Sequence, residues 1–210
     1  MKYHNKHKYC AALLVICMVL TMALPVSAAS FTDVTADCWY ADAVSQVADG
    51  GVMAGTSNAT FSPLQLVTRG MAAVVLWRLA GSPASSGKTS FPDVPDGSYY
   101  ADAAAWAAQQ SIVTGYSSGK FCGGDTVTRE QLAVMFYRYC MLNGAELAQG
   151  MLSNYVDDNS ISIWARAGMS YAVGAGIISG NGANQLNPGG SADRAQLAVM
   201  VDRLMTPAMG

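Results

Sequence analysis

The sequence predicts a mainly α-helical protein built from three tandem helix–loop–helix repeats. Three observations carry this prediction: an aromatic–x–Asp segment occurs three times, a polar residue followed by arginine occurs three times, and an apolar stripe with helical spacing follows each marker. The two markers keep nearly the same separation, 36, 36 and 37 positions, in the pairs Asp33–Arg69, Asp93–Arg129 and Asp157–Arg194. Units this short cannot each bury a core, so the copies must pack on one another.

Residues 1–28 have the features of a secretory signal peptide. Lysines open the segment, an apolar run extends from Ala11 to Leu24, and Val26-Ser27-Ala28 forms a small-residue cleavage site. The run is shorter than the roughly 20 residues that a bilayer span needs, so cleavage is favoured over a retained membrane anchor. We therefore place the three repeats of the exported chain at residues 29–82, 90–143 and 154–206.

The composition of the exported chain argues against several classes of function. Both histidines, His4 and His7, leave with the signal peptide, so the usual general base and the commonest nitrogen ligand of metals are missing. Cleavage also removes three lysines, which leaves nine Lys and Arg against fourteen Asp and Glu, a net charge of about −5. An acidic chain with two lysines has no electrostatic footprint for nucleic acid. Adjacent carboxylates such as Asp157-Asp158 usually point apart, and no acid–base pair recurs across a cleft, so an enzyme is the least favoured class.

Cysteine usage gives no sign of a metal or cofactor site. Cys38, Cys122 and Cys140 remain after cleavage, an odd number without a Cys-x-x-Cys pair, which argues against zinc. Cys140 falls on an apolar helix face, where a buried free thiol is expected. Cys38 and Cys122 fall in predicted loops, and a disulfide between them is the alternative to two free thiols.

The first helix of each repeat is expected to end in a glycine-bearing turn, followed by a short hairpin or β-bridge. Its apolar stripe recurs at Tyr40, Ala43, Val44, Val47 and Ala48; at Tyr100, Ala103, Ala104, Ala107 and Ala108; and at Ala165, Gly168, Met169, Ala172 and Val173. The many small residues on this stripe allow helices to approach closely.

The second helix is the clearest element of each repeat. Thr128 and Gln131 have the spacing of a capping box, in which the hydroxyl accepts a backbone N–H and the amide side chain reaches back. Asp193 and Gln196 have the same spacing, whereas Thr68 keeps only the cap. The apolar stripe behind these caps is Ala72, Val75, Leu76 and Leu79; Leu132, Met135, Phe136 and Tyr139; and Leu197, Met200, Val201 and Leu204. We expect these three helices to form the shared core.

A second arginine recurs nine positions after the first, at Arg78, Arg138 and Arg203. We expect it to complement the negative carboxyl end of its own helix.

The combined pattern resembles the S-layer homology (SLH) family over residues 31–205. Four features carry the resemblance: Phe-x-Asp-Val, an aromatic residue about six positions later, a glycine-rich turn, and Thr-Arg at the start of a second helix. The set recurs three times after a predicted signal peptide. It implies a pseudo-threefold, three-pronged helical assembly with grooves between adjacent repeats and short β-bridges in the loops. Such modules bind secondary cell wall polysaccharides, often bearing pyruvate ketals, and tether proteins to the bacterial wall. The alternative is a secreted scaffold that packs against other surface-layer proteins.

The resemblance also implies a glycan-binding set of one arginine, one aspartate, one aromatic and one loop glycine per repeat. The set is Arg69, Arg129 and Arg194; Asp33, Asp93 and Asp157; Trp39, Tyr99 and Trp164; and Gly55, Gly115 and Gly180. An arginine just after an N-cap stands beside unpaired backbone N–H groups at the positive end of the helix, and its fork fits a planar carboxylate. An aromatic face suits the C–H side of a sugar, Asp accepts from hydroxyls, and glycine lets a sugar approach the backbone.

Each group has a structural alternative. The aspartates can serve only to cap the first helix or to fix the turn before it. Trp39 and Trp164 can be core aromatics, and the arginines can be solvated charges in a first turn.

The chain departs from the family's Thr-Arg-Ala-Glu signature, because the fourth position holds Met71, Gln131 and Gln196. From the completeness of the helix starts we expect Arg129→Ala to weaken wall binding most and Arg69→Ala least, with the fold intact in each variant.

Overall fold

A computed structural model describes residues 31–85 and 89–206 of the chain. The predicted signal peptide, residues 1–28, lies outside the described residues. The described part is mainly helical, as predicted, with α1 (Ala41–Asp49), α2 (Arg69–Leu79), α3 (Ala101–Gln109), α4 (Arg129–Leu142), α5 (Arg166–Gly174), α6 (Arg194–Met205) and the short 3-10 turns η1 (Leu152–Asn154), η2 (Asp158–Ser160) and η3 (Ile163–Ala165). In this part of the chain, no helix has both the length and the apolar composition to cross a membrane.

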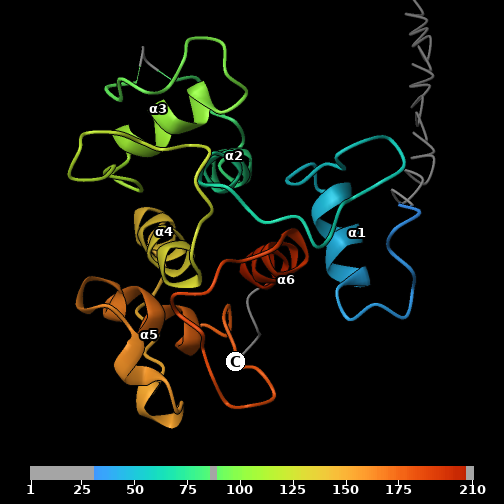
Figure 1. The fold of residues 1–210 in the computed structure, drawn as a ribbon, viewed down its shortest axis with the longest axis vertical. Helices are drawn as coiled ribbons and strands as arrows, with labels where there is room; N and C mark the ends of the chain where they lie inside the picture. Colours follow the sequence, from blue (N-terminus) through green and yellow to red (C-terminus); the bar gives the residue numbers. More distant parts are fainter. Residues whose placement is uncertain (1–30, 86–88, 207–210) are drawn as a thin grey trace, which may run out of the picture.

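The six helices form three prongs around a common centre (Figure 1). The second helices α2, α4 and α6 lie at the centre, and the first helices α1, α3 and α5 lie outside them. Each second helix packs against the first helix of another repeat: α2 on α3, α4 on α5, and α6 on α1. The last pairing joins the third repeat to the first, so the arrangement closes on itself and no repeat pairs its own two helices.

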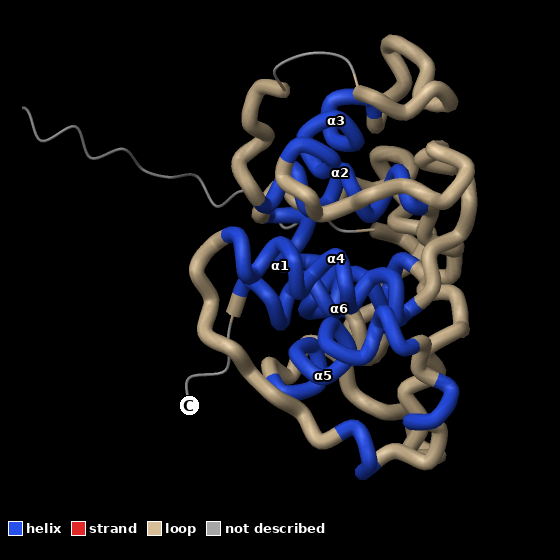
Figure 2. The backbone as a smooth tube through the Cα atoms, turned by 90° about the vertical axis from the view of Figure 1, so that its left-hand side faces the viewer, coloured by secondary structure: helices blue, strands red, loops and turns tan. Residues whose placement is uncertain are grey.

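The predicted apolar stripes form the core. Val44, Phe136 and Val201, one from each repeat, are at most 1% exposed, and the loop aromatics Phe61 and Phe121 are fully buried. Many of the loops lie on one side of the helices, and further connecting segments run along the opposite side (Figure 2). Long-range packing between repeats therefore supplies the core that a single repeat lacks.

A ring of backbone hydrogen bonds ties the three repeats together just before the second helices. The Val67 amide donates to the Ala192 carbonyl at 2.9 Å, the Ala192 amide to the Val127 carbonyl at 3.2 Å, and the Val127 amide to the Val67 carbonyl at 2.9 Å. All three residues are fully buried. The isolated β-bridges flank this ring, as Leu66 with Asp193, Thr68 with Thr126, and Thr128 with Ser191.

The β-bridges thus join different repeats rather than closing a hairpin inside each loop. The glycine-rich loops are closed instead by backbone bonds at 2.9 Å from Thr56 to Thr60, Tyr116 to Lys120 and Asn181 to Gln185, each accompanied by a second backbone bond within the loop. These are tight turns without strand pairing.

The helix caps follow the sequence with one exception. Thr128 and Gln131 form the predicted capping box, and the Thr68 hydroxyl accepts the Met71 amide at 3.3 Å. The Asp193 carboxylate accepts the Gln196 amide at 2.8 Å, but the Gln196 side chain does not reach back. Its Oε1 accepts from Arg129 instead, so the predicted second capping box is wrong.

The three cysteines of the described part are free thiols. Cys140 is buried on α4, as predicted, and burial raises its pKa. Cys38 and Cys122 form no disulfide.

Candidate functional site

The first arginine of each second helix joins two repeats. Its Nε donates to the carbonyl of a buried loop residue in another repeat, in the pairs Arg69–Phe121 at 2.9 Å, Arg129–Leu186 at 2.7 Å and Arg194–Phe61 at 2.8 Å. Arg69 and Arg194 are only 7% and 8% exposed. These arginines are therefore not solvated first-turn charges; each one is part of an interface.

The backbone N–H groups beside these arginines are already paired. The Arg69 amide donates to the Asp125 carbonyl and the Gly70 amide to the Gly123 carbonyl, both at 2.9 Å. The other two helix starts repeat the arrangement, with Arg129 to Gly190, Glu130 to Pro188, Arg194 to Gln65 and Ala195 to Pro63. The expectation of unpaired amides ready for an anion is wrong, because a neighbouring loop supplies carbonyls that the sequence pattern does not reveal. Any anion has to be held by side chains.

The aspartates hold the loop before the second helix of their own repeat. The two Asp93 oxygens accept the Phe121 amide at 2.8 Å and the Cys122 amide at 2.7 Å. Asp33 does the same with Phe61 and Ser62, and Asp157 with Leu186 and Asn187. Burial alone would raise the pKa of Asp33 and Asp93, but the amide hydrogen bonds outweigh it and lower both pKa values. None of the three caps a first helix.

The three loop glycines lie under an aromatic ring of their own repeat. A Cβ would stand 2.5 Å from the Phe31 ring at Gly55, 2.7 Å from Phe91 at Gly115 and 2.7 Å from Tyr155 at Gly180. Gly115 also has a φ of +71°, which favours glycine. Packing inside the repeat is therefore enough to require these glycines.

The three aromatics of the predicted set are exposed, so the core alternative is wrong. Trp39 is 68%, Tyr99 65% and Trp164 58% exposed. Large aromatic side chains that remain in water are typical of binding surfaces.

Trp39 and Trp164 each stand at the rim of a cavity. The Arg129 cavity has a volume of about 330 Å³ and is lined among others by Arg129, Arg203, Gln196, Asn181, Gln185 and Trp39. The Arg69 cavity has a volume of about 290 Å³ and is lined among others by Arg69, Arg138, Gln131, Thr114, Tyr116 and Trp164. In both, the first arginine comes from one repeat, the loop and second helix from the next, and the tryptophan from the third. A complete cavity of this kind requires all three repeats.

Two guanidinium groups meet in the Arg129 cavity. Arg129 Nη2 donates to the Ser179 carbonyl at 3.2 Å, and Arg203 Nη1 donates to the Ser179 hydroxyl at 3.3 Å. Arg129 Nη1 donates to Gln196 Oε1 at 3.4 Å. Burial lowers the pKa of Arg129, Asp157 and Asp193 raise it, and the positive charge of Arg203 lowers it. An anion between the two arginines would relieve their repulsion.

The Arg69 cavity has a different arrangement. Only Arg69 Nε donates to the protein, and Nη1 and Nη2 have no partner among the described residues. The guanidinium carbon lies 4.6 Å from the centroid of the Tyr116 ring. Arg138 Nη1 donates to the Ile112 carbonyl at 3.1 Å. The guanidinium group of Arg69 is thus buried and held in one orientation, and its Nη1 and Nη2 make no hydrogen bond to the described residues.

Neither cavity has an aspartate or glutamate among the described residues that line it. Each therefore holds two positive charges without a lining carboxylate, inside a chain whose net charge is negative. This local excess is suited to an anionic ligand.

The third symmetry-related position is built from different residues. Arg194 Nη2 donates to the Ala54 carbonyl at 2.6 Å, and its guanidinium carbon lies 4.4 Å from the centroid of the Phe61 ring. Met71 replaces the glutamine of the other repeats, and Tyr99 replaces the tryptophan. Arg194 thus donates to two carbonyls of repeat 1 and stacks on a buried ring of the same repeat.

The second arginine lies in the last turn of its own helix in repeats 1 and 3, as predicted, and in every repeat it also bonds a loop. Arg78, Arg138 and Arg203 donate to the carbonyls of Val52, Ile112 and Ile177, in the loop after the first helix of their own repeat. Arg138 lies before the last turn of α4, so the expected place at the carboxyl end of the helix is not found in repeat 2. Arg138 and Arg203 line the cavities, and their recurrence in every repeat was the signal that could have found them.

The sequence of this chain is similar to those of known proteins. Residues 30–73, 90–133 and 154–198 match the family model described as S-layer homology domain. The chain is 31% identical over 96% of its length to the surface-layer 125 kDa protein of Lysinibacillus sphaericus and 30% identical over 98% to an endoglucanase of Bacillus sp. (strain KSM-635). It is 28% identical over 71% of its length to the cellulosome-anchoring protein of Acetivibrio thermocellus. It spans only 17%, 23% and 34% of those three proteins, so the likeness covers a minor part of each.

Proposed function

Because this chain belongs to the S-layer homology domain family, we propose that it attaches to the bacterial cell wall by binding an anionic, pyruvylated secondary cell wall polysaccharide. It is a protein of the cell surface, as are the surface-layer proteins to which it is similar. The polysaccharide is the partner that its two cavities fit best.

The observation that carries the proposal is the pairing of two arginines with an exposed tryptophan in each cavity. A guanidinium binds a planar carboxylate through charge-assisted hydrogen bonds, and a tryptophan face covers the apolar side of a sugar ring. A pyruvate ketal places a carboxylate directly on such a ring. Each volume is close to the lower limit of about 300 Å³ for small-molecule sites, which suits a short stretch of glycan.

We assign different tasks to the twelve residues of the predicted set. Arg69, Arg129, Trp39 and Trp164 contact the glycan. The aspartates and glycines shape the loops that form the cavity walls, since both oxygens of each aspartate already accept backbone amides. Arg194 and Tyr99 belong to the third position, where we expect the weakest contribution.

The proposal includes no catalytic activity for this chain. The similarity to the endoglucanase spans 23% of that enzyme, so it does not bring an active site with it. The described residues around both cavities supply arginines, amides and aromatics, without the paired carboxylates that glycoside hydrolysis needs.

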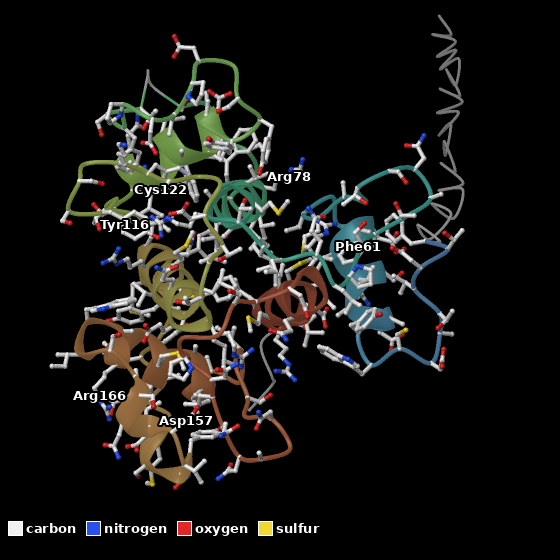
Figure 3. All side chains as sticks on the ribbon, in the orientation of Figure 1. Phe61, Arg78, Tyr116, Cys122, Asp157 and Arg166 are labelled. Atoms are coloured by element: carbon white, nitrogen blue, oxygen red, sulfur yellow. The ribbon has the colours of Figure 1, made fainter. Side chains whose placement is uncertain are left out.

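Cosedimentation with purified cell wall sacculi tests the proposal. The exported chain should pellet with intact sacculi and stay in solution after acid extraction of the secondary polymer. The double variant Arg69→Gln/Arg129→Gln should pellet poorly, whereas Arg166→Gln should pellet like the unmodified chain. Arg166 is the matched control because it is an arginine on the outer side of α5, paired with Asp158 at 3.9 Å and outside both cavities (Figure 3).

A scaffold that packs against other surface-layer proteins is the second candidate. Ile163 and Trp164 are adjacent and 91% and 58% exposed, and neighbouring apolar side chains in water can form part of a protein contact. Pelleting that survives polymer extraction but requires a surface-layer protein on the sacculi would favour this candidate over the glycan.

A further inference from the structure

An asparagine–glycine pair, Asn181-Gly182, lies in the loop beside the Arg129 cavity. Asn181 is exposed and lines that cavity, and the corresponding pairs in repeats 1 and 2 are Thr56-Ser57 and Tyr116-Ser117. A backbone nitrogen can attack the side-chain amide of the asparagine before it, and glycine permits this most easily because it has no side chain and a permissive backbone. The chain has one other such pair, Asn143-Gly144, at the carboxyl end of α4.

The attacking nitrogen is free in one pair and occupied in the other. The Gly182 amide makes no hydrogen bond to any described residue, and Gly182 is exposed. The Gly144 amide donates to the Met141 carbonyl at 3.1 Å. The amide has to lose its proton before it attacks, so a hydrogen bond to a carbonyl holds it back. Gly182 is therefore the better nucleophile of the two.

The side-chain carbonyl of Asn181 is polarised for the attack. Its Oδ1 accepts the Ala183 amide and the Gln185 amide, both at 3.0 Å. Two backbone N–H groups on one oxygen form the arrangement of an oxyanion hole, which stabilises negative charge on that oxygen while a nucleophile adds to the carbon. Asn143 lacks this arrangement. Its Nδ2 donates to the Tyr139 carbonyl at 2.8 Å, and no donor among the described residues reaches its Oδ1.

We propose that Asn181-Gly182 is a site of spontaneous deamidation that weakens the Arg129 cavity as the protein ages. The Gly182 nitrogen loses its proton to solvent and forms a bond to Asn181 Cγ. The bond from Cγ to Nδ2 breaks, ammonia leaves, and a cyclic imide remains. Water then opens the ring at either of its carbonyl carbons, which gives aspartate or isoaspartate. Water is consumed, ammonia is released, and nothing is oxidised or reduced.

The reaction adds a carboxylate to a cavity that has none among its described lining residues. Arg129 and Arg203 line the same cavity, so the new carboxylate neutralises part of their charge and competes with an external anion for their donors. Tyr116 holds the matching position in the Arg69 cavity, which therefore keeps its affinity. This effect on binding rests on the proposed function, whereas the chemistry at Asn181 does not.

Peptide mapping by mass spectrometry tests the chemistry. The exported chain is incubated in isotopically labelled water at mildly alkaline pH, and the conversion of Asn181 and Asn143 is followed in the same sample. Conversion of Asn181 should be about fivefold faster, the factor that one hydrogen bond contributes. Gly182→Ala should slow it, because the added methyl group hinders the attack. The methyl group itself is accommodated, since a Cβ at Gly182 meets nothing within 4 Å.

Cosedimentation with sacculi tests the effect on binding. Asn181→Asp should bind about tenfold more weakly than the fresh unmodified chain, which corresponds to one lost charge-assisted contact. Asn143→Asp is the matched control and should bind like the fresh chain, because Asn143 lines neither cavity. After the same incubation, Gly182→Ala should keep the binding that the unmodified chain loses.

Equal conversion at Asn181 and Asn143, or faster conversion at Asn143, would overturn the deamidation site. Fast conversion at Asn181 together with unchanged binding by Asn181→Asp would overturn the effect on the cavity while wall attachment stands. A fresh chain that fails to pellet with sacculi would overturn the proposed function and the effect on binding with it, and the rates from mass spectrometry would still decide the chemistry.

Discussion

Asp93 and Arg69 hold opposite polar groups of one residue, Phe121. The Asp93 carboxylate accepts the Phe121 amide at 2.8 Å, and Arg69 Nε donates to the Phe121 carbonyl at 2.9 Å. Asp33 and Arg194 share Phe61 in the same way, and Asp157 and Arg129 share Leu186. Each cavity wall is therefore coupled to an interface between repeats. Substitutions of the arginines must be measured for stability and for binding together.

Arg194→Ala is expected to destabilise the chain more than Arg69→Ala, because Arg69 donates to one carbonyl only. Arg194 is 8% exposed and donates to Phe61 at 2.8 Å and to Ala54 at 2.6 Å, so its loss leaves two carbonyls without a partner. We expect the free energy of unfolding in urea to fall by about 3 kcal/mol. Arg166→Ala, at an exposed pair, should change it by less than about 1 kcal/mol. An Arg194→Ala curve that overlays the unmodified one would show that this interface does not contribute. The expectation of an intact fold after any of the arginine substitutions is revised accordingly.

For binding, the structure leads us to reverse the order expected from the helix starts. Arg69→Lys should weaken binding of polymer fragments most. A lysine ammonium cannot bond the Phe121 carbonyl and also offer two further nitrogens to a carboxylate, as the Arg69 guanidinium can. We expect a loss of about 1.5–3 kcal/mol in binding free energy by calorimetry. Arg129→Lys should lose less, since all three nitrogens of Arg129 already donate to the protein, to Leu186, Gln196 and Ser179. A larger loss for Arg129→Lys would restore the order based on capping.

Asp93→Asn should change how stability depends on pH. The pKa of Asp93 in the folded chain lies below its ordinary value of 3.8, because hydrogen bonds from Phe121 and Cys122 outweigh the effect of burial. A carboxyl with a lowered folded-state pKa contributes stability that is complete above about pH 5 and is lost as the pH falls through 3.8 toward the folded-state value. The variant should be less stable by about 1–3 kcal/mol at neutral pH and should lose less stability on acidification. Urea unfolding from pH 7 to 3, with the exposed Asp125→Asn as control, checks this, and a curve parallel to that of the unmodified chain would contradict it.

Glu130 and Ser162 should be energetically coupled across repeats 2 and 3. The buried Glu130 carboxylate accepts the Ser162 amide and the Ser162 hydroxyl, each at 3.0 Å. Glu130→Ala copies Ala195, the residue at this position in repeat 3, so the helix tolerates it. A double-mutant cycle with Ser162→Ala should give a coupling energy of about 1 kcal/mol. Strictly additive losses would mean that the hydroxyl contributes nothing to the contact.

The elements that sequence reasoning predicted are those that depend on neighbouring residues. The stripes of the second helices and the Thr128 capping box follow from spacings of three and four positions, and the structure contains both. The box predicted for Asp193 and Gln196 does not form, because Arg129 of another repeat donates to the Gln196 side chain.

The site was less predictable because its contacts are long-range. Arg69 bonds a carbonyl 52 positions away, and Arg194 one 133 positions away. The pattern could not show that Trp39 of repeat 1 lines a cavity formed by repeats 2 and 3. The amides at the helix starts were misjudged for the same reason, since their acceptors come from a distant loop.

The ring formed by Val67, Val127 and Ala192 has a consequence for the order in which the chain folds. A protein that crosses a membrane with its amino end first presents Val67 long before Ala192, and α1 long before its partner α6. Helix α1 of the first repeat therefore emerges before α6, the helix on which it packs, has been made. We expect a nascent chain cut short before Ala192 to remain sensitive to proteases, whereas the chain that includes α6 becomes resistant in one step. Because the last repeat completes both the ring and the packing of α1, we expect compaction to be a late step that follows synthesis of α6.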